Sequence, residues 1–274
     1  MGVAFSVLNA KGGVGKTTSA VNIAAIATTL PKPNGERRRV LVCDLDQQMN
    51  ATQQLGFGEI EPEETLSQWV TRDAEIEQII KRDVAFLEGL DLLPSHYQLA
   101  YVDRGVLETG TWLRRKLQPI RDQYDLIIFD CPVHLGDLTR NALAASNGIL
   151  VPTQPEKHSV LGLPHLTARA AEVFEETEVR NYWAYVLITM ARPQTVDHQT
   201  WIRDVRAQYG SAGEGAGAVL NTLIRQNADL GKSATGGLPI VAYDDKCNGY
   251  QDYLAATEEL LNLLTPLPRS LRVI

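Results

Sequence analysis

The sequence predicts an α/β fold: a doubly wound, mainly parallel sheet flanked by helices. Two observations support this class. Short apolar runs alternate with segments of helical spacing along most of the 274 residues. The first apolar run, at 3–8, enters a glycine-rich stretch and then a helical segment, which is how a βαβ unit opens. We expect one domain over 1–264 and a short tail over 265–274.

The first half of the chain supplies three expected strands and three expected helices. An Ala/Ile-rich helix should span 19–30, and a second strand, 39–44, ends in acids, as a buried parallel strand does at an active edge. Apolar residues at helical spacing predict helices over 65–82 and 106–121, with a short strand at 90–94 between them.

The second half continues the alternation. The run at 124–130 is the plainest buried strand, because acids enclose an unbroken apolar stretch. Apolar runs predict two more strands and helical spacing predicts four more helices. The strands are 148–152 and 182–188, and the helices are 137–146, 159–176, 197–208 and 251–264.

Composition narrows the functional class. The proportions are those of an ordinary globular protein, with 44% hydrophobic and 22% charged residues. Three scattered cysteines without C-x-x-C spacing favour a reducing, cytoplasmic setting over a disulfide frame. No apolar run reaches the roughly 18 residues of a membrane span. The net charge of −7 argues against general nucleic-acid binding by the whole chain.

The glycine-rich stretch is the strongest motif. It reads Lys11-Gly12-Gly13-Val14-Gly15-Lys16-Thr17-Thr18. Glycines let successive backbone N–H groups surround a phosphate, and the following helix adds its dipole. Lys16 should reach the β- and γ-phosphates and the Thr17 hydroxyl should ligate Mg²⁺, so ATP and Mg²⁺ are the expected cofactors. The strict phosphate-loop pattern has a glycine where Ala10 stands, and Lys11 is an additional lysine.

The octad resembles the deviant Walker A motif of the ParA/MinD superfamily of partition and positioning ATPases. Further segments, which follow in the same order along the chain, make this resemblance specific. Asp44-Leu-Asp-Gln-Gln-Met-Asn-Ala-Thr52 is similar to its DxDPQxNAT segment, and Val151-Pro-Thr-Gln-Pro-Glu156 to its VPxxPE stretch. Similar matches at 90–95, 124–136 and 237–253 extend the resemblance over 1–264. The short ParA/Soj form, without an N-terminal DNA-binding extension, fits best because Lys11 follows the start almost at once.

The resemblance implies roles for particular residues. Two protomers would enclose ATP, with Lys11 crossing to the partner's phosphate as an electrostatic stabiliser. Asp46 would position the attacking water, Asp44 would support Mg²⁺ and its waters, and Asp130 would be the Walker B acid. The expected metal set is therefore Thr17, Asp44, Asp46 and Asp130, and the expected catalytic set is Lys11, Lys16 and Asp46. By position in the family, Met190 and Arg225 lie near the adenine.

The chain departs from the family pattern in two places. Gln47 replaces the proline after the second acid, and Val133-His134 replaces Pro-Ser after the Walker B acid. Both segments couple nucleotide state to dimerisation in the family, so a slow nucleotide switch is one alternative. Cys43 and Cys131 flank active-site acids, but buried strand cysteines mostly behave as small apolar residues.

The resemblance also implies non-specific DNA binding by the ATP dimer. Residues 180–250 hold seven Lys/Arg and six Asp/Glu, a net +1, so the rest carries −8. An ordinary solvated face is the competing interpretation. The DNA candidates are Arg225, Arg192, Arg203, Arg206 and Lys232.

Partner and location follow from the same resemblance. The expected function is nucleoid-associated positioning of a plasmid, a chromosome origin or a protein assembly such as a carboxysome. A ParB-like or other small activating protein would stimulate hydrolysis and release the dimer. Pro266 and Pro268 break the tail, so no stable membrane anchor is expected. A metabolic or signalling ATPase of the same fold, without DNA binding, is the alternative.

Overall fold

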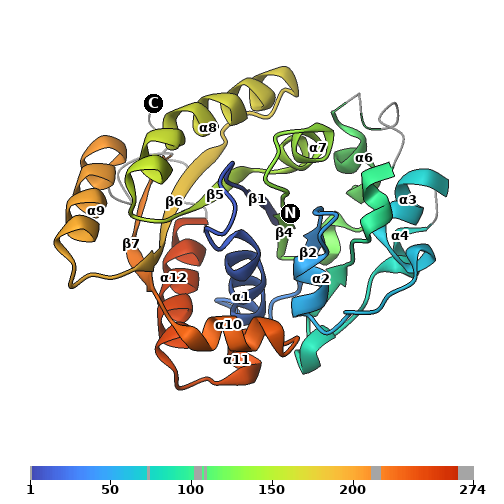
Figure 1. Cartoon of the computed structure of the whole chain (residues 1–274). Coiled ribbons are helices and arrows are strands. Elements are labelled where there is room, and N and C mark those ends of the chain that lie inside the picture. The colour runs from blue at the N-terminus through green and yellow to red at the C-terminus, as the bar shows by residue number, and fades with distance from the viewer. Residues whose placement is uncertain (1, 73–74, 102–106, 108–109, 211–216, 265–274) are drawn as a thin grey trace.

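Seven parallel strands form one sheet in the computed structural model, which describes residues 2–72, 75–101, 107, 110–210 and 217–264. The strand order is β3-β2-β4-β1-β5-β6-β7, with β1 in the middle (Figure 1). The strands are β1 (Val3–Val7), β2 (Val40–Asp44), β3 (Leu90–Leu93), β4 (Leu126–Asp130), β5 (Gly148–Thr153), β6 (Trp183–Ala191) and β7 (Gly217–Arg225). The predicted fold class is confirmed.

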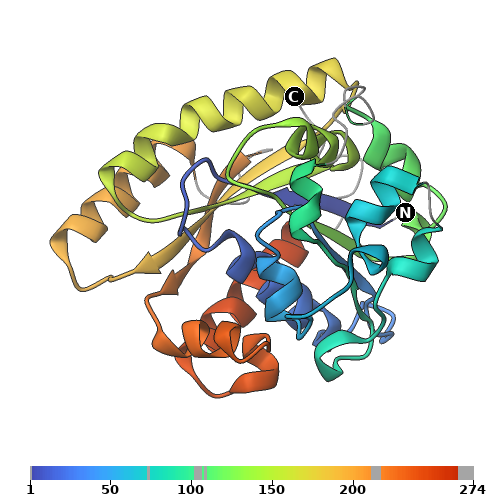
Figure 2. The same cartoon turned by 45° about the vertical axis from the view of Figure 1, so that its right-hand side comes forward.

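Helices cover both faces of the sheet (Figures 1 and 2). One face carries α3 (Leu66–Arg72), α4 (Ile76–Ile79), α6 (Trp112–Leu117), α7 (Asp137–Ala145), α8 (Lys157–Glu176) and α9 (Val196–Tyr209). The other carries α1 (Lys16–Thr29), α2 (Asn50–Gln54), α10 (Ala228–Thr235), α11 (Ile240–Tyr243) and α12 (Asn248–Leu264). Short 3₁₀ turns lie at η1 (Pro62–Glu64), η2 (Val84–Phe86), η3 (Tyr97–Tyr101) and η4 (Arg121–Gln123).

Alternating strand side chains build two cores. In β2, Leu41 and Cys43 face the α7–α8 layer, whereas Val40 and Val42 face the α1–α12 layer. All are buried, as expected for a parallel sheet covered on both sides. Helix α1 is enclosed by its neighbours, and its Ser19 hydroxyl lies 3.0 Å from the Tyr253 hydroxyl of α12. This contact fixes the helix that follows the glycine-rich loop.

The expected elements differ from the structure in four regions. Instead of one helix over 65–82, the chain forms α3 and α4, and Glu75 takes an extended backbone conformation (φ −70°, ψ 125°) before α4. Lys81 then pairs with Leu92 as an antiparallel bridge. The helix expected over 106–121 is described only as α6, and much of its start lies outside the described residues. Strand β7 and helices α2, α10 and α11 were not predicted.

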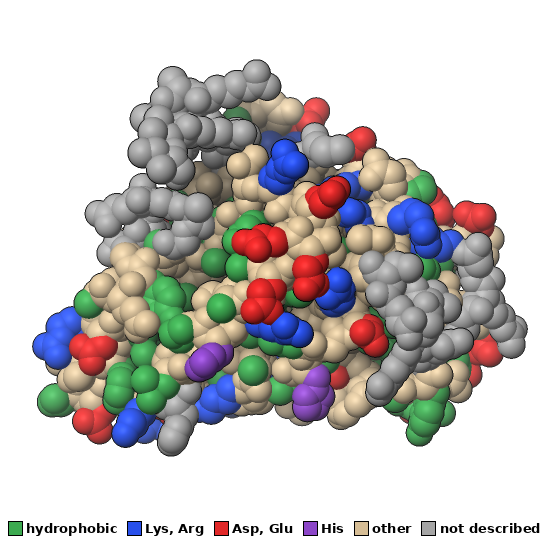
Figure 3. All heavy atoms as spheres, turned by 90° about the horizontal axis from the view of Figure 1, so that it is seen from above, with side chains coloured by type: hydrophobic (Ala, Val, Ile, Leu, Met, Phe, Trp, Pro, Cys, Tyr) green, Lys and Arg blue, Asp and Glu red, His purple; other side chains and the backbone are tan. Residues whose placement is uncertain are grey.

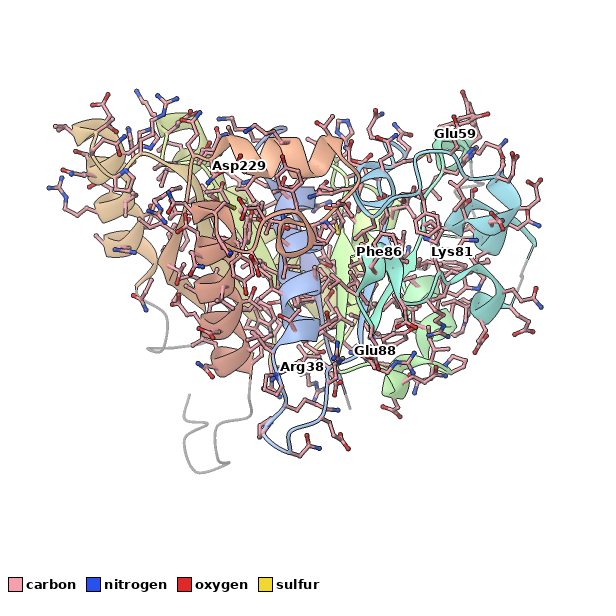
Figure 4. The ribbon with its side chains drawn as sticks, turned by 90° about the horizontal axis from the view of Figure 1, so that it is seen from below. Arg38, Glu59, Lys81, Phe86, Glu88 and Asp229 are labelled. Atoms are coloured by element: carbon pink, nitrogen blue, oxygen red, sulfur yellow. The ribbon has the colours of Figure 1, made fainter. Side chains whose placement is uncertain are left out.

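The two ends of the sheet have different roles. Figure 4 shows Asp229, at the start of α10, and Glu59, after α2, towards one end, with Arg38 and Glu88 towards the other. Arg38 and Glu88 precede β2 and β3, so the first end is the carboxyl edge of the parallel strands. In doubly wound sheets, ligands bind outside the carboxyl edge where the strand order reverses. The glycine-rich loop follows β1 at the centre of that edge.

Candidate nucleotide site

Glycines set the shape of the loop between β1 and α1. Gly13 and Gly15 have left-handed backbones, with φ of 72° and 87°, which cost residues with a Cβ atom about 1–2 kcal/mol. Gly15 is the N-cap of α1, so the helix begins at Lys16 with its amide dipoles pointing at the loop. A phosphate could therefore meet backbone N–H groups and the helix N-terminus together.

Side chains from three neighbouring strand ends hold the loop in place. Asn9 accepts a hydrogen bond from the Lys11 backbone N–H (2.9 Å) and donates to the Pro152 carbonyl (2.8 Å). The Thr189 hydroxyl donates to the Val14 carbonyl at 2.8 Å. Gln154 donates to the Gly13 carbonyl at 3.1 Å. These contacts fix the shape of the loop. No role for Asn9, Thr189 or Gln154 was predicted.

Lys16 points into the site beneath the loop. It is 8% exposed, and its Nζ donates to the Lys11 carbonyl at 3.2 Å. Burial lowers the pKa of Lys16, while the nearby carboxylates of Asp130 and Asp46 oppose that shift. The expected lysine and two of the expected acids are therefore electrostatic neighbours.

Asp44 is buried at the end of β2 and its carboxylate is fully engaged. It accepts hydrogen bonds from the Thr52 backbone N–H (2.8 Å), the Thr52 hydroxyl (2.7 Å) and the Asp46 backbone N–H (3.1 Å). Burial raises the pKa of Asp44 to about 6, and the Thr52 hydrogen bonds oppose the shift. The strand ends at Asp44, so Asp46 lies in a turn, where its carboxylate accepts from the Gln48 backbone N–H at 3.0 Å. The strand therefore does not continue to Asp46.

Asp130 has buried carboxylate oxygens that accept no hydrogen bond of good geometry from the described residues. Burial, reinforced by Asp44, raises its pKa well above the ordinary range, while the neighbouring Thr17 hydroxyl and Lys16 ammonium oppose the shift. An unpaired buried carboxylate is costly unless a cation or hydrated metal ion satisfies it. The residues present therefore fit the approach of Mg²⁺.

The described side chains alone do not form a complete metal site. Within the described ranges, no group of three or more His, Cys, Asp or Glu side chains could hold a metal ion. This agrees with Mg²⁺ chemistry in nucleotide sites, where phosphates and water provide most ligands and one or two protein side chains complete the set. The four-residue metal set Thr17, Asp44, Asp46 and Asp130 remains a prediction.

Lys11 lies at the start of the loop and contacts its own chain. Its Nζ donates to Glu156 Oε2 (2.7 Å), Gln154 Oε1 (3.1 Å) and the Ser159 hydroxyl (3.1 Å). An ammonium group has three donors, so these contacts use all of them. Contact with another protomer would therefore require Lys11 to exchange these partners.

Met190 and Arg225 are close together at the ends of β6 and β7. The register pairs Ala191 with Arg225, and Met190 is 40% exposed beside Gln154. Arg225 donates to Asp252 through Nε and Nη2, the latter at 2.7 Å. The guanidinium expected near the base is thus already paired with an acid of α12.

The DNA candidates do not form a free basic surface. Arg225 pairs with Asp252 and Lys232 with Asp229, and Arg203 lies 3.5 Å from Asp204. Arg206 donates to the Asn221 carbonyl, and Arg192 donates to Gln226. Helices α9 and α10, which carry three of the five, stand apart in both ribbon views (Figures 1 and 2).

Three other residues singled out in the sequence have ordinary surroundings. Cys43 and Cys131 are buried, and burial raises the pKa of both thiols well above the usual value, which disfavours the reactive thiolate. His134 is exposed in the loop after β4, and its carbonyl accepts from the Thr139 hydroxyl at 2.8 Å. The geometry assigns no chemical role to these side chains.

Comparison with known proteins supplies the family. A family model described as an AAA domain matches residues 3–181. The sporulation initiation inhibitor protein Soj of Bacillus subtilis is 33% identical over 263 residues, covering 95% of this chain and 98% of that protein. The chromosome partitioning protein ParA of Myxococcus xanthus is 31% identical over 272 residues, covering 97% and 90%. The chain belongs to the ParA/Soj family of partition ATPases. It is therefore a P-loop ATPase.

Solved structures agree on the fold. The cobyrinic acid a,c-diamide synthase of Mycobacterium smegmatis, with a bound ATP analogue and magnesium, is 26% identical with a TM-score of 0.76 and covers 96% of this chain and 95% of that one. Apo McdA from Cyanothece has a TM-score of 0.78 at 19% identity, covering 95% and 100%. The latter likeness concerns the fold alone. In the part of the chain that the structure describes, no helix is long and apolar enough to cross a bilayer.

Proposed function

We propose that this ParA/Soj-family ATPase binds ATP with Mg²⁺, dimerises around the nucleotide and positions a cargo on DNA. One observation carries the proposal. The loop that begins with Lys11 lies at the carboxyl edge beside three acids, one of which has buried oxygens that accept no hydrogen bond of good geometry from the described residues. Family membership and the magnesium-bound ATP analogue in a solved neighbour support the same ligand.

The residues suit distinct parts of nucleotide binding. The backbone N–H groups of 12–18 and the Lys16 ammonium would hold the phosphates, while Thr17 and Asp130 would hold Mg²⁺ directly or through water. Bound Mg²⁺ would neutralise charge on the phosphate oxygens. Asp44 would support the metal's water shell. Asp46 would orient the attacking water, and Met190 with Arg225 would border the base.

Dimerisation gives Lys11 a second role. Its three present acceptors all belong to its own chain. A phosphate of higher charge, presented by another protomer, would compete with the half-exposed Glu156 carboxylate for the ammonium. Exchange of partners would couple ATP binding to association.

DNA binding is the finer part of the proposal. Phosphate contacts from Arg192, Arg203, Arg206, Arg225 and Lys232 would place the dimer on the nucleoid, with steep salt dependence. Several of these cations must first leave an acidic partner. An activating ParB-like protein would stimulate hydrolysis and release the dimer from DNA, and the cargo would be a plasmid, an origin or a protein assembly.

The second candidate is a metabolic ATPase of the same fold. The 26% identity to the solved synthase of M. smegmatis supports this candidate. A gel-shift assay on unrelated duplex DNA at low salt separates the two. We expect a shift with ATP and Mg²⁺, and none with ADP or without nucleotide. No shift with ATP would contradict the DNA role and leave the metabolic alternative, whereas a shift independent of nucleotide would contradict ATP-dependent binding by a dimer.

A further inference from the structure

Asp46 sits in a turn whose position is set by its backbone. Its N–H donates to Asp44 Oδ1 at 3.1 Å, and its carbonyl accepts from the Ser95 hydroxyl at 2.7 Å. Its carboxylate contacts the following turn, through the Gln48 N–H. The Asp46 carbonyl also accepts from the Met49 backbone N–H at 2.9 Å. The direction in which the carboxylate points thus depends on three backbone contacts, of which only the one to Ser95 comes from outside the segment 44–49.

Ser95 follows β3 and contacts two segments at once. While its hydroxyl donates to the Asp46 carbonyl, its own backbone N–H donates to the Thr52 hydroxyl at 2.9 Å. The Thr52 hydroxyl donates in turn to Asp44 Oδ2 at 2.7 Å. The hydrogen bonds therefore form a closed ring through Asp44, Asp46, Ser95 and Thr52.

The ring is buried beside the nucleotide site. Asp44, Thr52 and Ser95 have no exposed surface, and each is satisfied by its neighbours in the ring. In a low-dielectric setting, satisfied polar networks rigidify their surroundings, whereas a missing member leaves a costly unpaired group. Leu45, between the two acids, donates its N–H to the Asp130 carbonyl at 3.0 Å, so the ring is also tied to β4.

We propose that Ser95, acting through this ring with Thr52, is a positioning residue that holds Asp46 in place for ATP hydrolysis. The inference rests on the proposed role of Asp46. Among the described residues, Ser95 makes no hydrogen bond to the nucleotide loop, so its effect should fall on turnover rather than on ATP binding. The edge strand β3 would contribute to catalysis in this way.

The test compares Ser95→Ala with Ser233→Ala, which removes another fully buried hydroxyl-to-carbonyl hydrogen bond, to Leu230 at 3.0 Å. Steady-state ATPase assays should show kcat about tenfold lower for Ser95→Ala, with KM for ATP within about twofold and Ser233→Ala unchanged. Amide hydrogen exchange of the nucleotide-free protein should be about tenfold faster over 45–52 in Ser95→Ala only.

If Ser95→Ala does not fold, a second pair of variants, at Thr52, tests the same ring. Thr52→Ser keeps the hydroxyl of the ring and should retain kcat, whereas the isosteric Thr52→Val loses it and should lower kcat. Unchanged exchange over 45–52 together with wild-type kcat would overturn the inference. So would losses of kcat and ATP binding that merely follow a lower melting temperature.

Asp46→Ala in the same assays separates the two hypotheses. If Asp46→Ala turns over ATP at the wild-type rate, the proposed catalytic role of Asp46 fails, and the positioning role fails with it even if exchange is faster. If Asp46→Ala is at least tenfold slower while Ser95→Ala is not, only the positioning role is wrong.

Discussion

At the scale of single residues, the site buries two carboxylates, which is unfavourable for stability but suits the binding of Mg²⁺. Asp130 and Asp44 are both buried, and burial is the largest cause of the raised pKa of each; Asp44 raises the pKa of Asp130 further, and Asp46 raises that of Asp44. Asp44 has hydrogen bonds that compensate, but Asp130 has none of good geometry among the described residues. In the absence of metal and nucleotide, the Asp130 carboxylate should therefore lower the free energy of unfolding, although the same carboxylate suits Mg²⁺ binding.

We predict that Asp130→Asn makes the metal-free protein more stable by about 1–3 kcal/mol, because the amide removes an unpaired buried charge. Because the pKa of Asp130 is higher in the folded than in the unfolded state, its penalty is full above the folded-state pKa and declines with falling pH until the unfolded carboxyl is protonated as well. The advantage of Asp130→Asn should thus shrink as the pH falls towards the ordinary aspartate pKa of about 4. Urea unfolding in EDTA measures it.

Asp91→Asn is the matched control. Asp91 is 1% exposed but accepts from Arg39, Arg82 and the Tyr124 hydroxyl. Weakening this paired carboxylate should lower the unfolding free energy instead. If Asp130→Asn also destabilises the metal-free protein, the ionised carboxylate is not an uncompensated charge.

At the scale of elements, the sequence was informative where local chemistry dictates the backbone. The glycine loop was predicted because only glycine tolerates the backbone of positions 13 and 15 easily. The apolar strands were predicted because both faces of the sheet are covered. The prediction of a single helix over 65–82 was wrong. The separate helices α3 and α4 pack into the same core, so the spacing of their apolar residues looks like that of one continuous helix.

Other features depend on contacts distant in sequence. Strand β7 begins in a glycine-rich region of weak strand preference, and pairing with β6 fixes it. The cis partners of Lys11 are more than 140 residues away, so no local pattern announces them. The motif matches at 44–52 and 90–95 contain Thr52 and Ser95, but their hydrogen-bonded ring emerges only in three dimensions.

The turn before β3 allows a test at this scale. Asp83, Ala85 and Phe86 all have left-handed backbones without being glycine, and Phe86 is 97% exposed. We predict that Phe86→Gly stabilises the protein by about 0.5–1 kcal/mol, because relief of strain exceeds the cost of a more flexible unfolded chain and little packing is lost. Thermal unfolding measures the change.

Leu161→Gly provides the comparison, because Leu161 is 59% exposed but lies within α8. There, glycine should destabilise by about 0.5–1 kcal/mol. A loss of stability in Phe86→Gly similar to that of Leu161→Gly would mean that the Phe86 ring stabilises the turn.

At the scale of the whole molecule, net charge is a poor guide to the DNA surface. Figure 3 shows lysine, arginine and acidic side chains interspersed on the face covered by α7, α8 and α9, rather than gathered by sign. The five DNA candidates are likewise neutralised or tethered within the protomer. If the protein binds DNA, we expect the dimer to bring together basic side chains that, in the described part of the protomer, lie apart or are paired with acids.

We propose that Lys11 mediates ATP-dependent dimerisation, and sedimentation velocity with a non-hydrolysable ATP analogue and Mg²⁺ is the decisive test. The control is Lys32→Ala. This variant likewise removes an ion-paired lysine, but Lys32 and its partners Glu36 and Asp125 lie at the opposite end of the sheet. We predict that the wild type and Lys32→Ala sediment as dimers with the analogue and as monomers with ADP. Lys11→Ala should remain monomeric with both. A dimer of Lys11→Ala as tight as that of the wild type, or a wild type that stays monomeric with the analogue, would contradict the account.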